Sequence, residues 1–298
     1  MTRVQLALFA DATDVVLGLA KELRAFEQAG VALDVRHVAD ADEAHAALFT
    51  GTADIAGMSF DDVLTCALSG HRAAPEVRVL LPVHRGFSSL MARPDVASVE
   101  ALRGRRLAVD TYTGYASALF EVLQRHGVDA ERDCEVLLAG ATDRRFRALL
   151  GGAFDATLLG TPFDLLAERA GMRRLIRPRQ TLDGYLGVVI AARTTWLAER
   201  RAAADAFTRT FRETLQIAMA DPHDALVHRV LDARFGKELQ TTEALDGLAA
   251  ALFGPESDFV AATLPGNDDV AAVVRLYERH RHAKIDMVDA LRLFDVPL

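Results

Sequence analysis

The sequence lacks several features that would narrow its chemistry at once. It has only two cysteines among 298 residues, Cys66 and Cys134, so a disulfide framework is not expected. This count favours neither an oxidising nor a reducing compartment. No GxGxxG, P-loop, HExxH or GxSxG motif occurs. The sequence therefore carries none of the common signals of dinucleotide, nucleotide-phosphate, zinc-protease or serine-hydrolase sites.

Long apolar runs and an excess of basic residues are also missing. No stretch reaches ~18 uninterrupted apolar residues, so no transmembrane helix is expected. The formal net charge is −8, which argues against nucleic acid as the main partner. The N-terminus, MTRVQLALFADATDVV, has no apolar signal-peptide core of ~7–15 residues. Either the protein is cytoplasmic as written, or an export signal has been removed and it is periplasmic or membrane-associated.

What the chain does have is an alternation of short apolar runs and amphipathic stretches. Its 51% hydrophobic and 26% charged residues suit one large or two medium domains. Strands are expected at 4–10, 31–38, 53–59, 77–83, 105–110, 134–140, 154–160 and within 181–193. Helices are expected at 14–30, 40–51, 60–70, 114–127, 141–152, 161–171, 196–221, 222–236, 241–254 and 267–286. This alternation predicts parallel βαβ units followed by a helical C-terminal part.

One short segment occurs twice. ALFTGTADIAG (47–57) is echoed by ALLGGAFDATL (148–158) at a constant offset of 101 residues. The alanine, leucine, glycine and aspartate at the first, second, fifth and eighth positions match. The same offset superimposes the order of six expected elements, and a period this long is not that of a solenoid. The repetition predicts two similarly built α/β lobes.

These segments resemble the type II periplasmic substrate-binding proteins. The resemblance rests on the helix end and following segment at 26–31 and 47–56, on SVEALRGRRLAVDTYTGY (98–115) and on GAFDATLLGTPFDLLAERAG (152–171). Within that group the chain is most similar to the sulfonate, nitrate and taurine binders and to the thiamin-pyrimidine-precursor-binding proteins. The resemblance extends over about residues 1–220.

The resemblance implies an α/β fold of two Rossmann-like lobes joined by two hinge strands, with extra C-terminal helices. The first lobe would comprise 1–85 and 188–298, and the second 86–187. The chain would cross between them near 82–87 and 183–187, and a ligand would bind in the cleft as the lobes close. Gly86, Gly184 and Gly187 either absorb the dihedral change at the crossings or are ordinary turn glycines.

Candidate ligand contacts follow from the rule that parallel α/β sheets bind ligands beyond the carboxyl ends of their strands. The rule was applied to the first and third strands of each lobe and to the crossings. It selects Asp11, Thr13, Ser59, Phe60, His84, Arg85, Thr111, Tyr112, Thr113, Gly114, Tyr115, Gly160, Thr161 and Tyr185.

The segment DTYTGYAS (110–117) is the strongest local candidate. Gly114 opens a helix, and the free backbone N–H groups there suit an anion. The alternative is a threonine cap of an ordinary surface helix. Tyr112, Tyr115 and Tyr185 either stack on a planar ligand or are half-buried packing residues.

The charge of the ligand stays open at this point. Arg85 either clamps a carboxylate or sulfonate, or is a solvated charge at the crossing. Asp11 and Asp61 suit an amine instead.

The expected function is a solute-binding protein that captures a small organic ligand, a carboxylate, a sulfonate or a pyrimidine-like molecule, for an ABC permease. A monomer is expected, with no cofactor and with no residue assigned to catalysis or to a metal. The alternatives are a cytoplasmic lyase, of decarboxylase or dehydratase type, and a ligand-sensing protein.

Few residues support the lyase alternative. Cys66 falls within an expected helix and Cys134 opens a strand, so neither is a convincing nucleophile. His84 with Asp11 or Asp183 is the remaining acid–base pair. The histidines of HRH (280–282) point apart on a helix and are not expected to share a metal ion.

Overall fold

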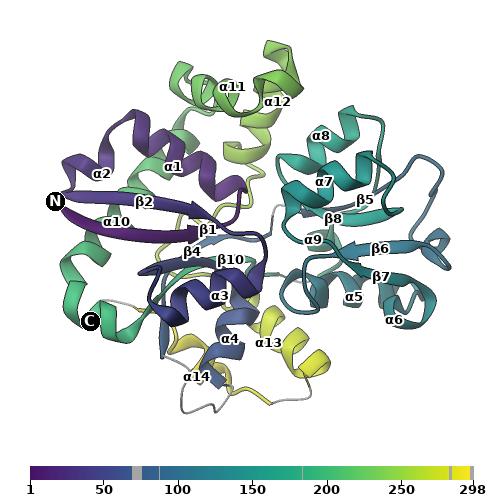
Figure 1. Ribbon diagram of the computed structural model, residues 1–298, viewed down its shortest axis with the longest axis horizontal. Coiled ribbons are helices and arrows are strands. Elements are labelled where there is room, and N and C mark those ends of the chain that lie inside the picture. Colours follow the sequence, from purple (N-terminus) through teal and green to yellow (C-terminus); the bar gives the residue numbers. More distant parts are fainter. Residues whose placement is uncertain (69–75, 87, 183, 282–283, 296–298) are drawn as a thin grey trace.

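Two five-stranded sheets lie side by side in the computed structural model, which describes residues 1–68, 76–86, 88–182, 184–281 and 284–295 (Figure 1). The first sheet has the order β2-β1-β3-β10-β4 and the second β7-β6-β8-β5-β9. The strands of the first sheet are β1 (Thr2–Leu8), β2 (Val31–His37), β3 (Ile55–Ser59), β4 (Val77–His84) and β10 (Val188–Arg193). Those of the second are β5 (Ser88–Ala92), β6 (Arg106–Val109), β7 (Glu135–Leu138), β8 (Ala156–Gly160) and β9 (Arg173–Ile176).

One strand of each sheet arrives from the other. The chain leaves the first sheet after β4 and enters the second as β5, which runs antiparallel between β8 and β9. It returns as β10, which runs antiparallel between β3 and β4. The neighbours β2-β1-β3 and β7-β6-β8 are parallel. The α/β fold of two lobes with extra helices, predicted from the sequence, is confirmed.

Helices cover both sheets. In the first lobe these are α1 (Ala12–Glu22), α2 (Ala25–Gln28), α3 (Ala41–Thr50) and α4 (Phe60–Leu68). The second lobe has α5 (Tyr115–Arg125), α6 (Ala130–Asp133), α7 (Thr142–Leu150), α8 (Phe163–Arg169), α9 (Pro178–Thr181) and the 3₁₀ turn Glu100–Leu102. The C-terminal helices are α10 (Thr194–Ala220), α11 (Ala225–Leu239), α12 (Thr242–Phe253), α13 (Asn267–Arg281) and α14 (Met287–Leu291). Within the described ranges, none of the helices combines the length and apolarity that a membrane crossing requires.

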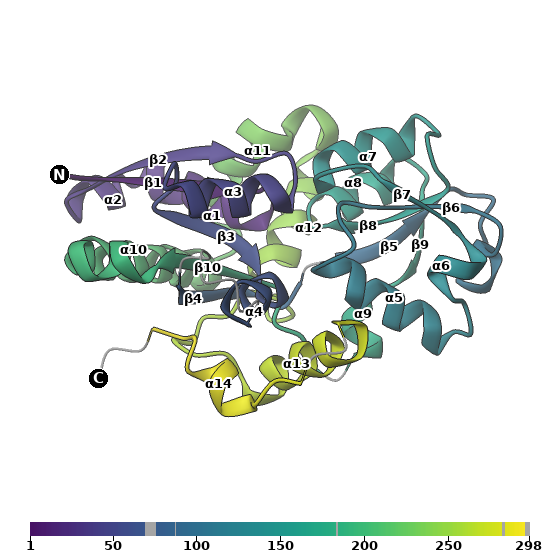
Figure 2. The ribbon, with the colours of Figure 1, turned by 60° about the horizontal axis from the view of Figure 1, so that its bottom comes forward.

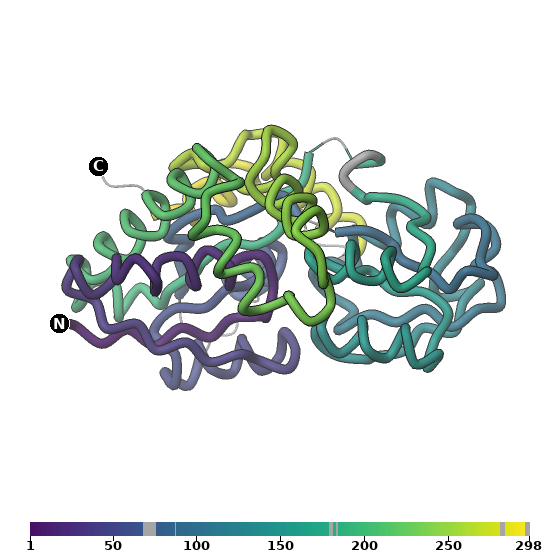
Figure 3. The backbone as a smooth tube through the Cα atoms, turned by 90° about the horizontal axis from the view of Figure 1, so that it is seen from above, coloured from purple at the N-terminus to yellow at the C-terminus, as the bar shows by residue number. Residues whose placement is uncertain are grey.

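The alternation of side chains along each strand divides the core of the first lobe. Leu6, Leu8 and Ile190 face a cluster formed with α1, α10, α11 and α12. Ala7 and Val189 face the opposite cluster, formed with α3, α4 and α13. Figure 2 shows α13 and α14 running beneath β4 and α4, while Figure 3 shows α11 and α12 beside the second lobe.

Two details of the sequence prediction were wrong. The helix expected over 14–30 is two helices, because Arg24 takes a left-handed φ of 52° and interrupts it. This break turns Phe26 inward onto Phe207 of α10, with ring centroids 5.4 Å apart. The short elements β5, β9, α6, α9 and α14 were not expected, since four or five residues carry too little periodicity to be recognised.

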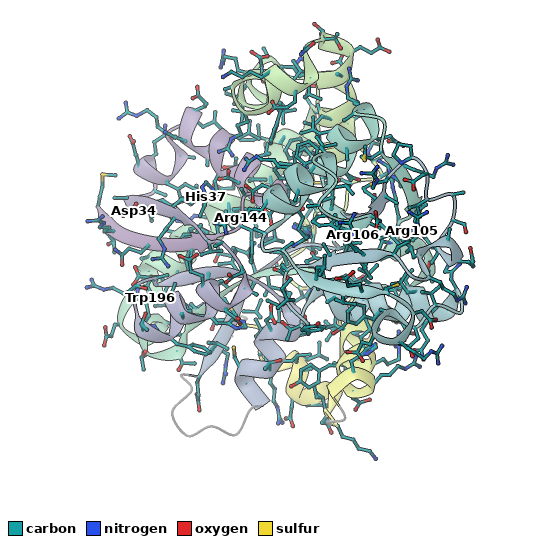
Figure 4. All side chains as sticks on the ribbon, turned by 45° about the vertical axis from the view of Figure 1, so that its right-hand side comes forward. Asp34, His37, Arg105, Arg106, Arg144 and Trp196 are labelled. Carbon is teal, nitrogen blue, oxygen red and sulfur yellow. The ribbon has the colours of Figure 1, made fainter. Side chains whose placement is uncertain are left out.

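The aspartate of the repeated segment makes the same hydrogen bonds in both lobes. Asp54 precedes β3, and its Oδ2 accepts a hydrogen bond from the backbone N–H of Gln5 in β1 (2.9 Å). Asp155 precedes β8, and its Oδ2 accepts from the N–H of Arg106 in β6 (2.9 Å; Arg106 is labelled in Figure 4). In return, the backbone N–H of Asp54 donates to the carbonyl of Gln5, and that of Asp155 donates to the carbonyl of Arg106. Each aspartate therefore clamps the first strand of its sheet to the third.

Replacing either clamp should destabilise the fold. Asp54→Ala and Asp155→Ala each leave a backbone N–H without its acceptor, which typically costs about 1–3 kcal/mol. Asp155→Ala should cost more, because Asp155 also binds the guanidinium of Arg106 (3.1 Å). Urea unfolding measures both losses. Asp34→Ala is the control, since Asp34 is in an exposed pair with Arg3. Equal effects of all three changes would contradict the clamp.

A second buried carboxylate joins three elements of the first lobe. Asp14 of α1 lies 3.2 Å from Nε2 of His37 at the end of β2, and Arg234 of α11 binds the same carboxylate. The hydrogen bond with Asp14 raises the pKa of His37, although burial opposes this. Burial raises the pKa of Asp14, but the hydrogen bonds from His37 and Arg234 outweigh it and leave the pKa lowered.

These shifts give the stability a defined pH dependence. The raised pKa of His37 means that its contribution is complete below the unfolded value of 6.5 and is lost as the pH rises through the folded pKa. His37→Asn should therefore destabilise the protein more at about pH 5.5 than at about pH 8.5. Urea unfolding of both proteins in both buffers tests this, and a loss that is the same at the two pH values would exclude it.

Candidate functional site

A cavity lies between the two lobes at the carboxyl ends of β1, β3, β6 and β8. It encloses about 740 Å³, its opening to solvent included. Its walls are formed by Phe9, Asp11, Ala12, Ala41, Ser59, Asp62, His84, Gly86, Ser88, Asp110, Thr111, Thr113, Gly114, Tyr115, Thr142, Arg145, Leu158, Gly160, Thr161 and Val188. Both sheets thus present their strand ends to one space, the arrangement in which α/β proteins bind ligands.

Many of the residues selected from the sequence come together here. The cavity walls include Asp11, Ser59, His84, Thr111, Thr113, Gly114, Tyr115, Gly160 and Thr161. They come from both lobes, and His84 is the last residue of β4. Their contact with a ligand stays a prediction.

The structure places three other candidates in the protein interior, outside the cavity walls. Thr13 is fully buried at the start of α1. Phe60 is also fully buried and packs against Phe294, with ring centroids 5.3 Å apart. Tyr185 is buried against Tyr115 at 5.7 Å, so it supports a wall residue from behind.

The remaining two candidates have other surroundings. The Nε of Arg85 donates to Oδ2 of Asp269 at the start of α13 (2.9 Å), so this charge is paired within the first lobe. Tyr112 is half exposed and faces a separate hollow beside α5, α6 and α13. The cluster of three tyrosines expected at the strand ends is therefore reduced to Tyr115 in the cavity wall, with Tyr185 behind it.

Several wall residues were missed from the sequence. Ala41 and Thr142 begin the helices that follow the second strand of each lobe, and extending the strand-end rule to those strands would have found them. Arg145 lies one helical turn after Thr142 and required the same step. Asp62 lies in the first turn of α4, after a predicted site residue. Asp110 begins the segment 110–117 and Gly86 lies at a predicted crossing, so both adjoin predicted site residues, whereas Phe9, Leu158 and Val188 carry no local signal that distinguishes them from packing residues.

The amino end of α5 is occupied by a carboxylate of the other lobe. The N–H of Gly114 donates to Oδ2 of Asp61 at 2.7 Å. The Oγ of Ser59 lies 2.8 Å from Oδ1 of Asp61 and 2.6 Å from Oδ2 of Asp62. The sequence predicted this N–H to be free for an anionic ligand, and that detail was wrong. The helix dipole does attract an anion, but the protein supplies it.

A second hydrogen bond also joins the two lobes. The N–H of Ala141, at the start of α7, donates to the carbonyl of Ala39 after β2 (2.9 Å). Together with the bond between Asp61 and Gly114, it holds the strand ends of the two lobes face to face. This is a closed arrangement of the lobes.

The charged wall residues are mostly acidic. Asp11, Asp62 and Asp110 contribute carboxylates, against the guanidinium of Arg145 and the imidazole of His84. Burial raises the pKa of Asp110, although the nearby Arg145 opposes this. Burial also lowers the pKa of Arg145.

The guanidinium of Arg145 is largely committed to the protein. It donates to the carbonyls of Gly140 and of Leu158, the latter at 3.1 Å. These bonds hold two of its nitrogens against the loop before α7 and against β8, while its Nε has no hydrogen-bond partner within the described residues. The walls therefore combine carboxylates and apolar surface with the hydroxyls of serine, threonine and tyrosine side chains and the Nε–H of Arg145.

Nucleophilic chemistry finds little support among the described residues. Burial raises the pKa of the Cys66 thiol to about 12 and also raises that of Cys134, and neither lines the cavity. Nε2 of His84 lies 3.9 Å from Oδ2 of Asp11, which is too long for a hydrogen bond. Asp183 and His282 lie outside the described residues.

Known proteins of similar fold include an alkanesulfonate-binding protein and a nitrate-binding protein. The alkanesulfonate-binding protein SsuA from Xanthomonas axonopodis pv. citri aligns with a TM-score of 0.77 at 17% identity, over 97% of this chain and 98% of its own. The periplasmic nitrate-binding protein NrtA from Synechocystis PCC 6803 aligns with a TM-score of 0.76 at 13% identity, over 98% of this chain and 85% of its own. At these identities the likeness concerns the fold.

The same fold occurs in a fungal protein. A Candida albicans protein described as exhibiting the generic periplasmic binding protein structural fold aligns with a TM-score of 0.73 at 12% identity, over 98% of this chain and 95% of its own. No match was found among curated protein sequences. The family model described as NMT1/THI5 like matches residues 15–225. The chain therefore belongs to the NMT1/THI5-like family.

Proposed function

We propose that the protein is a solute-binding protein that captures a small organic molecule between its two lobes and delivers it to an ABC permease. The cavity between the strand ends of both sheets is the observation that carries this proposal. The similar alkanesulfonate-binding and nitrate-binding proteins support it. A permease partner would place the mature protein in the periplasm or at the membrane surface.

Binding would proceed by closure of the lobes around the ligand. We take 1–85 with 188–298 as one body and 86–187 as the other. Gly86 and Gly184 have φ of 112° and 83° at the crossings, values that few residues other than glycine adopt. Gly187 serves packing instead, since a Cβ there would lie 2.3 Å from the hydroxyl of Tyr115.

The chemistry of the walls favours a ligand with N–H donors or a positive charge over a sulfonate or nitrate. The amino end of α5, which would otherwise attract an anionic ligand, already holds the carboxylate of Asp61. Asp11 and Asp62 add carboxylates to the walls, whereas the charge of Arg145 lies near that of Asp110 and two of its nitrogens are bound to backbone carbonyls. The side chain of Tyr115 adds an aromatic surface on which a planar ring can stack. An aminated heterocycle satisfies all these features.

A thermal-shift panel tests both the function and the ligand class. Aminopyrimidines and other aminated heterocycles should raise the melting temperature, and a ligand at 100 times its Kd should add about 2.7 kcal/mol of stability. Alkanesulfonates and nitrate should have no effect. A shift with the anions alone would overturn the ligand class but not the binding function. Recovery of a chemically altered ligand would replace the binding function with an enzymatic one.

Asp11→Asn examines the charge of the site without removing a helix cap. Asp11 caps α1 by accepting from the N–H of Thr13, and asparagine caps equally well. The variant should fold normally and weaken binding of a cationic ligand about tenfold or more, as measured by calorimetry. Asp286→Asn, the same change at the cap of α14, is the matched control and should bind as the wild type does. Equal affinity of the two variants would remove Asp11 from the site.

The closed arrangement should depend on Asp61. Asp61→Ala removes the acceptor of the Gly114 N–H, so the unliganded lobes should separate more often. Small-angle scattering should then give a larger radius of gyration, and the Gly114 amide should exchange faster with deuterium. Asp42→Ala, at an exposed position in the first turn of α3, should change neither. An unchanged radius and exchange rate in Asp61→Ala would rule out this closing contact.

Gly114→Ala tests whether the cleft tolerates a side chain where the lobes meet. Gly114 has a φ of 63°, and a Cβ there would lie 3.1 Å from Oγ of Ser59 in the other lobe. The variant should therefore lose the ligand-induced shift while remaining folded. Gly104→Ala is the control, since Gly104 has a φ of 76° but no atom within 4 Å of its Cβ position. Loss of the shift in both variants would assign the effect to backbone strain rather than to the cleft.

A further inference from the structure

Two histidines and an aspartate meet at one end of the α11–α12 helix pair, away from the cavity. His223 lies in the turn before α11, His228 in its second turn, and Asp246 on α12. Nδ1 of His223 is 3.2 Å from Oδ1 of Asp246, and Nε2 of His228 is 3.1 Å from the same oxygen. The three ligand atoms lie within 4.8 Å of one another.

The two distances to the aspartate oxygen match those between neighbouring ligands of a tetrahedral metal centre. Zinc binds imidazole nitrogen and carboxylate oxygen at about 2.0–2.2 Å, so neighbouring ligands in a tetrahedron lie about 3.3 Å apart. Two imidazoles and one carboxylate form a common zinc donor set, with a fourth position for water. The combination of nitrogen donors and one oxygen favours zinc over calcium or magnesium, which prefer oxygen alone.

Hydrogen bonds explain the positions of only some of the side chains in this cluster. Nε2 of His228 is buried and makes no hydrogen bond within the described residues, although the carboxylate oxygen is 3.1 Å away. A nitrogen so close to an acceptor but not aligned as a donor suits an imidazole whose lone pair faces a cation. The backbone at the first ligand is also held, since the N–H of His223 donates to Oδ1 of Asp221 (3.1 Å).

We propose that His223, His228 and Asp246 form a zinc site that fastens α11 to α12. The two helices matter to the whole molecule, because α11 reaches the second lobe. Phe235 of α11 packs edge-on against Phe163 of α8 at 6.4 Å, and the guanidinium of Arg169 donates to the carbonyl of Leu239 (3.4 Å). None of the three ligands lines the interlobe cavity, so a zinc ion held here would stabilise the helix pair and would not contact the ligand in the cavity.

Titration calorimetry with Zn²⁺ tests the site, on untagged protein first dialysed against a chelator. The wild type should bind one zinc per chain with a Kd of about 10 μM or tighter, and zinc should raise its melting temperature. Cobalt should produce the visible absorption of tetrahedral coordination. Magnesium and calcium should do neither.

Matched variants connect the binding to these residues. His228→Gln and Asp246→Asn should each weaken zinc binding at least tenfold and remove the cobalt spectrum while the circular dichroism stays native. His126→Gln is the control, because His126 faces a single carboxylate, that of Glu100, at 3.5 Å. Zinc binding that persists in both site variants, or that is absent from the wild type, would overturn the proposal.

Discussion

The architecture depends on the exchange of one inner strand between the two sheets. β5 and β10 are hydrogen-bonded on both edges, so each crossing of the chain ends in the interior of a sheet rather than at its margin. An inner strand is not released without breaking two ladders of backbone hydrogen bonds. The two crossings of the chain, between β4 and β5 and between α9 and β10, therefore each lead from one sheet into the interior of the other. The strand ends of both sheets face the same space as a result.

The electrostatics of that space follow from one interlobe contact. The amino end of a helix attracts negative charge. At the amino end of α5, this charge is the carboxylate of Asp61, which comes from the opposite lobe. The contact joins the two lobes and occupies the helix end at which an anion would otherwise be favoured. A shared fold with sulfonate and nitrate binders is compatible with a different ligand, because the wall side chains rather than the strand order determine selectivity.

The repeated residues serve the fold of each lobe, whereas the residues that line the cavity are not repeated. Asp54 and Asp155 make equivalent backbone contacts, and the strand pairs at β1–β3 and β6–β8 keep the same register at an offset of 101 residues. Beyond these strands the two lobes differ. Ser59 is followed by Phe60 and two aspartates, whereas Gly160 is followed by threonine and proline. The repeated part builds two sheets, and the unrepeated part makes the two walls of the cavity chemically unlike.

Sequence patterns alone predict the α/β class, the two lobes, most element positions and many of the residues that line the interlobe cavity. These properties follow from local periodicity and from the rule for strand ends. Both can be applied to residues that are close together in the sequence. The hydrogen-bond and ion-pair partners of the polar groups, by contrast, depend on the tertiary structure. Asp61 and Gly114 are far apart in sequence, as are Arg85 and Asp269, and no local pattern records that they meet. The cluster of His223, His228 and Asp246 likewise exists only because α11 and α12 pack against each other. Periodicity specifies which face of an element is buried, whereas the packing of one element against another specifies which charges neutralise each other and which remain for a ligand.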